Sequence, residues 1–195
     1  MVSQTEELSF RRFKIRSMPT VKGWRAVAFR GGKRATEFAL AESREEAIAS
    51  VKAELAAAYA DELAARSEDG FPTSGWVLAA FQNLRVSNLQ DKMLQAHFRA
   101  PAHILTATQL AKAGGSASYG TANNHYGQLG RALAEEMEWE PPLEPGASVP
   151  VWTFALAVEA VPGEAQADTG EWRWKLRPQV AEALALHDLN RTPNV

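Results

Sequence analysis

A polar segment at residues 67–75 (SEDGFPTSG) separates two parts of the chain that carry different hydrophobic patterns. Its glycines, its proline and its short polar residues are typical of a connection between folded units. The chain has 195 residues, which is enough for two small hydrophobic cores. We therefore predict two domains, residues 1–70 and residues 71–195.

The first domain shows strand patterns followed by one long helix. Apolar residues recur in three runs over residues 8–40, and the pair Gly31-Gly32 is typical of a hairpin turn. The runs contain Phe10, Phe13 and Ile15, then Trp24, Val27 and Phe29, then Thr36, Phe38 and Leu40, with a looser connection between Pro19 and Gly23. Ser43 and Glu46 form a capping-box pattern that opens a helix over residues 43–66. We predict a three-stranded antiparallel sheet with this helix on one face.

Charge alternates along the chain, although the net charge is only -2. Residues 1–34 hold nine basic and two acidic residues, whereas residues 35–70 hold three basic and nine acidic residues. Residues 71–131 carry a net charge of +4, and residues 132–195 carry a net charge of -7. This distribution excludes a uniformly basic protein and predicts local basic patches.

The basic patch of the first domain should lie on one face of its sheet. Successive side chains of a strand alternate between faces, so Phe13 and Ile15 are expected to face the helix while their basic neighbours face away. The cations predicted on the outer face are Arg12, Lys14, Arg16 and Arg25, the last of them opposite Trp24 and Val27. Such a face would contact phosphates with salt-dependent affinity.

Three basic strands followed by a helix, over residues 10–55, resemble the arm-binding domain of phage-type integrases. In that family a three-stranded sheet lies in the DNA major groove, so the resemblance implies nucleic-acid contact through the sheet. The residues leave a plainer alternative open, in which the cations pair with the acidic helix or with a protein partner.

The second domain is predicted to consist mainly of helices with one β-hairpin. Residues 76–84 are apolar and fit either a strand or a helix. Two capping patterns, Ser87 with Gln90 and Thr106 with Gln109, open helices that end near residues 98 and 113. A longer helix follows over residues 121–137, then two strands at residues 149–161 and 171–176, then a helix from Pro178. The whole chain is therefore expected to have an α+β fold.

Residues 103–137 have the sequence form of a helix-turn-helix, with a short capped helix, a Gly-containing turn and a longer helix. The hairpin after it would make the domain a winged helix, which presents its second helix to the major groove. Asn pairs with adenine, and Ser or Thr bonds to bases or phosphates. The predicted nucleic-acid contacts are Lys112, Ser116, Ser118, Tyr119, Thr121, Asn123, Asn124 and Arg131. The alternative is a protein-interaction module in which the asparagines serve as helix caps.

Short motifs within residues 100–187 carry a second resemblance: Tyr126-Gly127, Leu129-Gly130-Arg131, and Trp174 before Leu176-Arg177-Pro178. They are similar to a region beside the nuclease domain in some bacterial endonucleases of the HNH class, including enzymes of the modified-cytosine restriction type. The resemblance implies a DNA-associated accessory module. It does not imply nuclease activity, because the chain has no His-Asn-His constellation.

No catalytic or metal-binding pattern is found in the sequence. The absence of cysteine excludes disulfides, zinc ribbons and thiol catalysis. His97, His103 and His125 have no carboxylate three or four residues away, so we expect no metal and no cofactor. No apolar run is long enough to span a membrane and no signal-peptide core is present, so we expect a cytoplasmic protein.

The leading hypothesis is a non-catalytic nucleic-acid-binding protein, with phosphate contacts from the basic sheet and base contacts from the helix at residues 121–137. DNA is the expected partner, and the residues do not distinguish DNA from RNA. A second hypothesis is a protein-interaction adaptor or homodimer that uses an aromatic hairpin with Trp152, Phe154, Trp172 and Trp174 on its strands. A small enzyme of unrecognised type is the third.

Overall fold

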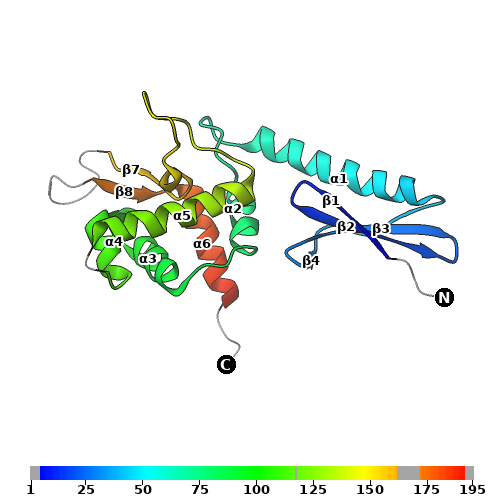
Figure 1. Cartoon of the computed structure of the whole chain (residues 1–195), viewed down its shortest axis with the longest axis horizontal. Helices are drawn as coiled ribbons and strands as arrows, with labels where there is room; N and C mark the ends of the chain where they lie inside the picture. Colours follow the sequence, from blue (N-terminus) through cyan, green and yellow to red (C-terminus); the bar gives the residue numbers. More distant parts are fainter. Residues whose placement is uncertain (1–4, 117, 162–171, 192–195) are drawn as a thin grey trace. The chain divides into compact units, whose positions relative to one another are not determined.

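The computed structural model describes residues 5–116, 118–161 and 172–191, with only the backbone described for residues 188–191. The chain forms two compact units, Met1–Gly70 and Phe71–Val195 (Figure 1). Each unit has its own hydrophobic core. The fold combines α-helices with antiparallel sheets, and a sheet at the start of the chain is followed mainly by helices.

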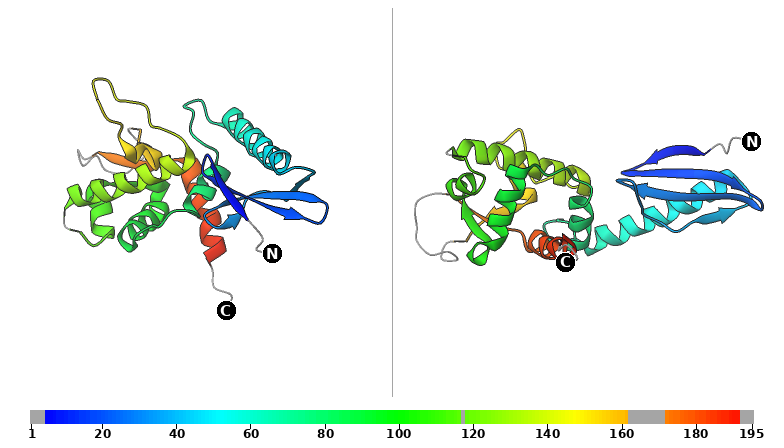
Figure 2. Two further views of the ribbon diagram at one scale, coloured as in Figure 1. Left: turned by 45° about the vertical axis from the view of Figure 1, so that its right-hand side comes forward. Right: turned by 90° about the horizontal axis from the view of Figure 1, so that it is seen from below.

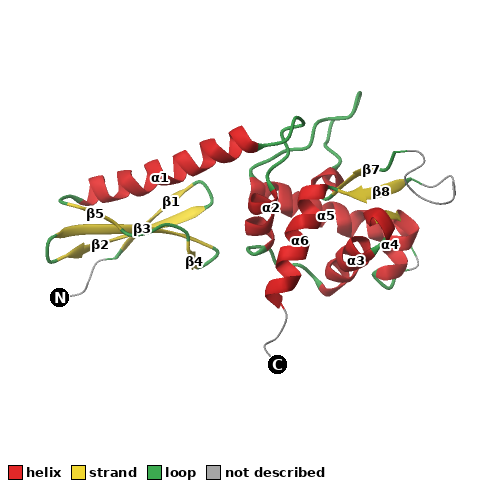
Figure 3. Cartoon of the chain, turned by 180° about the vertical axis from the view of Figure 1, so that it is seen from behind, coloured by secondary structure: helices red, strands yellow, loops and turns green. Residues whose placement is uncertain are grey.

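The first unit is built on an antiparallel sheet (Figure 3). Its strands are β1 (Glu6–Phe10), β2 (Phe13–Thr20), β3 (Gly23–Arg30), β4 (Lys33–Arg34) and β5 (Ala39–Ala41). Strand β2 lies between β1 and β3, while β4 and β5 both pair with β3. The predicted antiparallel sheet is present, but it has five strands in place of three.

Three details of the strand prediction are wrong. The first run is a hairpin of two strands, because Arg11 adopts a left-handed conformation (φ 50°) and turns the chain between β1 and β2. The connection near residues 19–23 is tight, since β2 and β3 stay paired up to Thr20 and Gly23. The third run forms a strand only over β5, because the Thr36 hydroxyl accepts the Ala28 N–H (3.0 Å) in place of a strand carbonyl.

One long helix, α1 (Arg44–Ala65), covers one face of this sheet, as the sequence pattern predicted (Figure 2). Its capping box is formed, since the Ser43 hydroxyl accepts the Glu46 N–H and the Glu46 carboxylate accepts the Ser43 N–H. Ile15 packs into the core against this helix. Its strand neighbours Lys14 and Arg16 therefore point to the opposite face.

The second unit contains helices and a small antiparallel sheet. The helices are α2 (Ser74–Phe81), α3 (Asn88–Arg99), α4 (Ala107–Ala113), α5 (Tyr119–Met137) and α6 (Pro178–Arg191), with 3-10 helices η1 (Pro101–His103) and η2 (Trp152–Ala155). Strand β8 (Arg173–Leu176) lies between β6 (Ile104–Thr106) and β7 (Ala157–Glu159). The capping boxes predicted at Ser87 and Thr106 are both formed.

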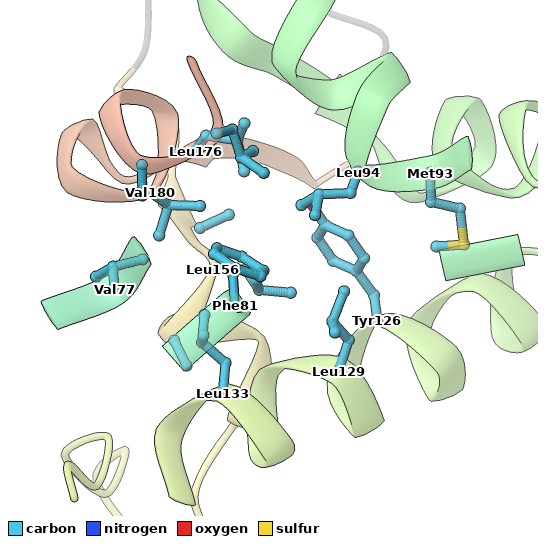
Figure 4. Close-up of a cluster of buried hydrophobic side chains, with 14 of the residues drawn as sticks. Val77, Phe81, Met93, Leu94, Tyr126, Leu129, Leu133, Leu156, Leu176 and Val180 are labelled. Carbon is cyan, nitrogen blue, oxygen red and sulfur yellow. The ribbon is translucent and has the colours of Figure 1, made fainter. Parts of the chain in front are cut away.

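The core of the second unit collects side chains from α2 to α6 and from the small sheet (Figure 4). Val77, Met93, Leu133, Leu156 and Val180 are fully buried in it. Residues 76–84, which fit a strand or a helix by pattern, belong largely to α2. The core therefore draws on segments that lie about a hundred residues apart in the sequence.

The predicted strand over residues 149–161 is wrong for most of its length. Residues 152–155 form η2, and β7 begins only at Ala157. The backbone of η2 packs against α5, where a Cβ placed on Gly130 would lie 2.8 Å from the carbonyl carbon of Trp152. Trp152 and Phe154 therefore do not lie on a strand of the hairpin. The predicted connecting loop falls largely on residues 162–171, outside the described residues.

Candidate nucleic-acid interface

The sheet face turned away from α1, called the open face from here on, carries basic and aromatic side chains. Residues paired directly across two antiparallel strands share a face. Lys14 pairs with Phe29, and Phe29 pairs in turn with Arg34. By the same register the open face contains Lys14, Arg16, Arg25, Val27, Phe29 and Arg34.

Lys14, Arg16 and Arg25 lie on the open face, as the sequence pattern predicted, but Arg12 does not. Arg12 belongs to the turn between β1 and β2, because the first run folds back on itself there. Val27 was expected opposite Arg25 and instead shares its face, since residues two apart on a strand point the same way. Val27 is still only 1% exposed. Long basic side chains beside it can cover apolar surface with their stems while their charges stay in water.

Guanidinium groups lie over phenylalanine rings on the open face. The Arg16 guanidinium carbon is 5.0 Å from the centroid of the Phe29 ring. Arg25 and Arg34 both lie over the Phe38 ring, at 5.0 Å and 5.9 Å. These distances are within the range of cation–π contacts, which hold charged groups against apolar surface. The open face is therefore an interleaved surface of cations and aromatic rings.

Two carboxylates partly neutralise the open face. Arg16 Nε donates to Glu7 Oε2 at 2.9 Å, and Lys14 Nζ lies 3.9 Å from Glu7 Oε1. Arg34 pairs with Glu37 at 3.0 Å. All of these charged groups are well exposed to solvent, so each pair is weak and open to competition by another anion. The carboxylate that pairs with Lys14 and Arg16 comes from the neighbouring strand β1 and not from α1.

In the second unit, α4 is followed by Gly114 and Gly115, the glycines that were predicted to end it. Gly115 has a positive φ of 80°, which suits glycine at the end of α4. Ser116 is half-buried, and its hydroxyl accepts the Ser118 N–H at 3.2 Å. Ser118 precedes α5 without making a side-chain capping hydrogen bond. The helix begins at Tyr119, two residues before the predicted start.

The exposed side of α5 is polar and largely uncharged. Asn123 and Asn124 are exposed, Thr121 is half-buried, and Asn124 Oδ1 accepts a hydrogen bond from Gln128 at 3.2 Å. Arg131 is exposed two turns further on and donates to Glu135 at 2.9 Å. No Lys, Arg, Asp or Glu precedes Arg131 on this helix. The first part of α5 therefore offers hydrogen-bonding groups without charge.

Lys112 is exposed on α4. It lines a shallow depression with Arg99 and Gln109, together with residues 96, 100, 101, 105 and 113. That depression is bounded by α3 and α4 and contains no residue of α5. Asn123 and Asn124 therefore do not line the depression that Lys112 borders.

The structure brings Tyr119 and Asn123 together with Trp172, a residue that sequence reasoning did not assign to the interface. With Ala107 and Thr108 they line a cavity of about 290 Å³. Tyr119 is 65% exposed and Trp172 is 52% exposed. The two-residue spacing of Trp172 and Trp174 indicated a shared direction, and nothing in the sequence indicated the neighbour on α5.

A buried hydrogen-bond network lies on the inner side of α5. His97 Nδ1 is 2.7 Å from the Tyr126 hydroxyl, and His97 Nε2 is 2.9 Å from the Trp174 carbonyl. A carbonyl can only accept, so Nε2 carries the proton and Nδ1 accepts from the tyrosine. Burial lowers the pKa of His97 to about 4 and raises the pKa of the Tyr126 hydroxyl. The network ties α3, α5 and β8 together through uncharged groups.

Several of the residues that carry the HNH-type resemblance have packing roles in this chain, whereas Arg131 is exposed. Gly130 makes close contact with η2, and Tyr126 is fully buried beside His97. Arg177 is 8% exposed, donates from Nε to the Phe154 carbonyl at 2.6 Å, and lies 4.1 Å from the centroid of the Phe71 ring. These positions are therefore explained by the core of the unit.

Comparison with known proteins gives no match: no protein-family model, no curated protein and no solved structure matches the chain. Within residues 5–116, 118–161 and 172–191, no group of three or more His, Asp and Glu side chains is placed to hold a metal ion. In the same described ranges, no helix has the length and apolarity needed to cross a membrane.

Proposed function

We propose that this chain is a non-catalytic nucleic-acid-binding protein whose expected partner is DNA. The open face of the first sheet contacts phosphates, and the exposed side of α5 contacts bases. The observation that carries the proposal is the open face itself, where Lys14, Arg16, Arg25 and Arg34 alternate with Phe29 and Phe38. Cations that track a phosphate backbone beside aromatic faces are the usual surface of a nucleic-acid-binding sheet.

The ion pairs of the open face are compatible with phosphate binding. Glu7 and Glu37 pair with exposed cations, and such surface pairs contribute at most about 1 kcal/mol each. A phosphate offers the same cations a strong, geometrically suited acceptor. Exchange of one anion for another therefore costs little, and counterion release favours the nucleic acid.

For the second unit we propose a winged-helix domain. Its order of elements supports this assignment, because α3, β6, α4 and α5 are followed by the antiparallel strands β7 and β8. Strand β6 pairs with β8 and completes a three-stranded sheet. In that arrangement α5 is the helix offered to the major groove, with Asn123 and Asn124 near its start.

The adaptor hypothesis has less support from this structure. Trp152 and Trp174 are partly buried against the hydrophobic core, and Phe154 is half-buried. Trp172 is 52% exposed, so the four rings do not form one exposed aromatic stripe. The surface that this hypothesis requires is therefore reduced to a single ring among the described residues.

Binding to a mixed 30-base-pair duplex should weaken steeply as salt rises. In the double variant Lys14→Ala/Arg16→Ala, the slope of log K against log salt should become shallower by about 0.9 for each phosphate that the protein no longer neutralises. Fluorescence anisotropy over a salt series measures both quantities. The matched control is Lys33→Ala/Lys92→Ala, since both lysines are exposed and neither lies on the open face.

Equal slopes for the two double variants would contradict the assignment of the open face. Absence of binding at low salt, for duplex and for single strands alike, would contradict nucleic-acid binding altogether. Tighter binding to RNA than to DNA would mean that RNA is the partner, and the open face would remain the assigned binding surface.

The variant Asn123→Ala/Asn124→Ala tests base contact by α5. We expect it to keep the salt slope of the unmodified protein and to lose preference among duplex sequences, because amides read base edges and carry no charge. Selection from a random duplex pool, followed by sequencing, measures that preference. An unchanged preference would show that bases are read elsewhere or not at all.

A further inference from the structure

We propose that the cavity lined by Tyr119, Asn123 and Trp172 binds a single unstacked nucleobase. The proposal rests on the proposed function, since it gives the nucleic acid a second mode of contact with α5. The cavity measures about 290 Å³, which is at the small end of ligand sites and suits one base better than a larger molecule. Its walls come from α4, α5 and the residue that precedes β8.

Two aromatic rings border this cavity from different elements. Tyr119 and Asn123 lie one helical turn apart on α5, so they share a side of that helix. Trp172 comes from the residue before β8, nearly fifty positions later in the sequence. A planar heteroaromatic group can stack against such rings, and aromatic stacking is how proteins hold splayed-out bases.

The exposed Trp172 ring lies beside a second tryptophan ring, that of Trp174. Its centroid is 5.8 Å from the centroid of Trp174, and Trp174 in turn makes an edge contact with Phe154 at 5.9 Å. The backbone of Trp174 is also fixed, because its carbonyl accepts a hydrogen bond from His97 Nε2. The exposed ring is thus attached to a packed aromatic row, and a base that stacks on it meets a preorganised surface.

Asn123 gives the cavity a polar group suited to a base edge. Its side-chain amide offers both donors and an acceptor. The amide makes no hydrogen bond to any residue in the described part of the chain, whereas the neighbouring Asn124 already bonds to Gln128. A base edge presents the complementary combination of donors and acceptors. Two stacking rings with one free amide favour a nucleobase over an aliphatic or a purely ionic ligand.

The experiment uses 2-aminopurine, a fluorescent base that is quenched when it stacks. It is offered to the full chain in four forms: as the free nucleoside, within a single strand, opposite thymine in a duplex, and opposite an abasic site in a duplex. We expect quenching by the protein with the single strand and the abasic duplex, where the base is free to leave its stack. The fully paired duplex should bind with little quenching.

Tyr119→Ala and Trp172→Ala should each weaken binding of the single strand by at least about fivefold and abolish the quenching. Trp172→Phe keeps a ring and should retain most of both signals. The control is Leu143→Ala, because Leu143 is a similarly exposed apolar residue (57%) that does not line the cavity. Circular dichroism of each variant confirms that the unit stays folded.

The outcomes separate this inference from the proposed function. Salt-dependent binding of the oligonucleotides, without quenching and without an effect of the two alanine variants, overturns the base site and leaves the proposed function standing. Quenching of the free nucleoside, with no binding of any oligonucleotide, supports the base site and overturns the proposed function. Failure of all four probes overturns both.

Discussion

Replacing Gly130 by alanine is expected to destabilise the second unit by about 3 kcal/mol or more, equivalent to a fall in Tm of roughly 10 °C. A Cβ at this position would lie 2.8 Å from the carbonyl carbon of Trp152 and closer still to its oxygen. Both obstacles are backbone atoms, so neither can be relieved by a change of rotamer. Either α5 and η2 must separate or the core around them must loosen.

Gly127→Ala is the matched control, because it changes the same residue type on the same helix. A Cβ there meets its nearest atom, Thr153 Oγ1, at 4.0 Å, which is ordinary contact. Alanine is the better helix former, so this variant should match or exceed the stability of the parent by up to about 1 kcal/mol. Equal destabilisation of the two variants would show that the contact with η2 is not the cause.

Tryptophan fluorescence during thermal or urea unfolding measures both variants. Five of the six tryptophans lie in residues 71–195, so this signal reports mainly on the second unit. Trp24 is the exception, and the two units need not unfold together. A separate transition seen by circular dichroism would therefore be assigned to the first unit and should not move.

The second unit should also lose stability in mild acid because of His97. Burial lowers its pKa from 6.5 to about 4 in the folded chain, so between these values the unfolded chain binds more protons. Stability is then independent of this group above about pH 6.5 and falls by about 1.4 kcal/mol per pH unit on the way down to pH 4. The full loss is about 3 kcal/mol.

His97→Gln tests this assignment through a slope, not through stability alone. The variant should be less stable at pH 7.5, because the hydrogen bonds to Tyr126 and Trp174 are disturbed, yet it should lose part of the dependence on pH between 6.5 and 4.5. Tyr126→Phe removes one hydrogen bond and keeps the histidine, so it should cost about 1–3 kcal/mol and keep the pH dependence. Parallel pH profiles for the parent and His97→Gln would assign the acid sensitivity to other groups.

Features set by a few neighbouring residues were predictable in this chain. The capping boxes at Ser43, Ser87 and Thr106 and the helices that they open were all predicted from spacing. Each depends on hydrogen bonds that span three residues and on local propensity. The placement of Lys14 and Arg16 on the sheet face opposite to that of Ile15 likewise follows from the two-residue period of a strand.

The wrong strand predictions fall where the conformation of a segment depends on contacts with residues distant in the sequence. The segment at residues 152–155 became η2 and not a strand, where its backbone lies against Gly130 of α5. The residues before β5 do not form a strand, because the Ala28 N–H of β3 donates to the Thr36 hydroxyl and not to a backbone carbonyl of that segment. Neither event is encoded within a window of a few residues, so pattern analysis assigned regular strands there.

Side-chain environments depended on the tertiary structure most of all. His97 and Trp174 are 77 residues apart, and only the packing of such distant segments around His97 buries it and lowers its pKa. Likewise, only the packing of α4, α5 and β8 places Trp172 beside Tyr119 and Asn123. Local spacing in this chain settles where helices begin and which strand residues share a face. Burial, pKa and the shape of a cavity depend on every element that surrounds a residue, and these meet only in the folded chain.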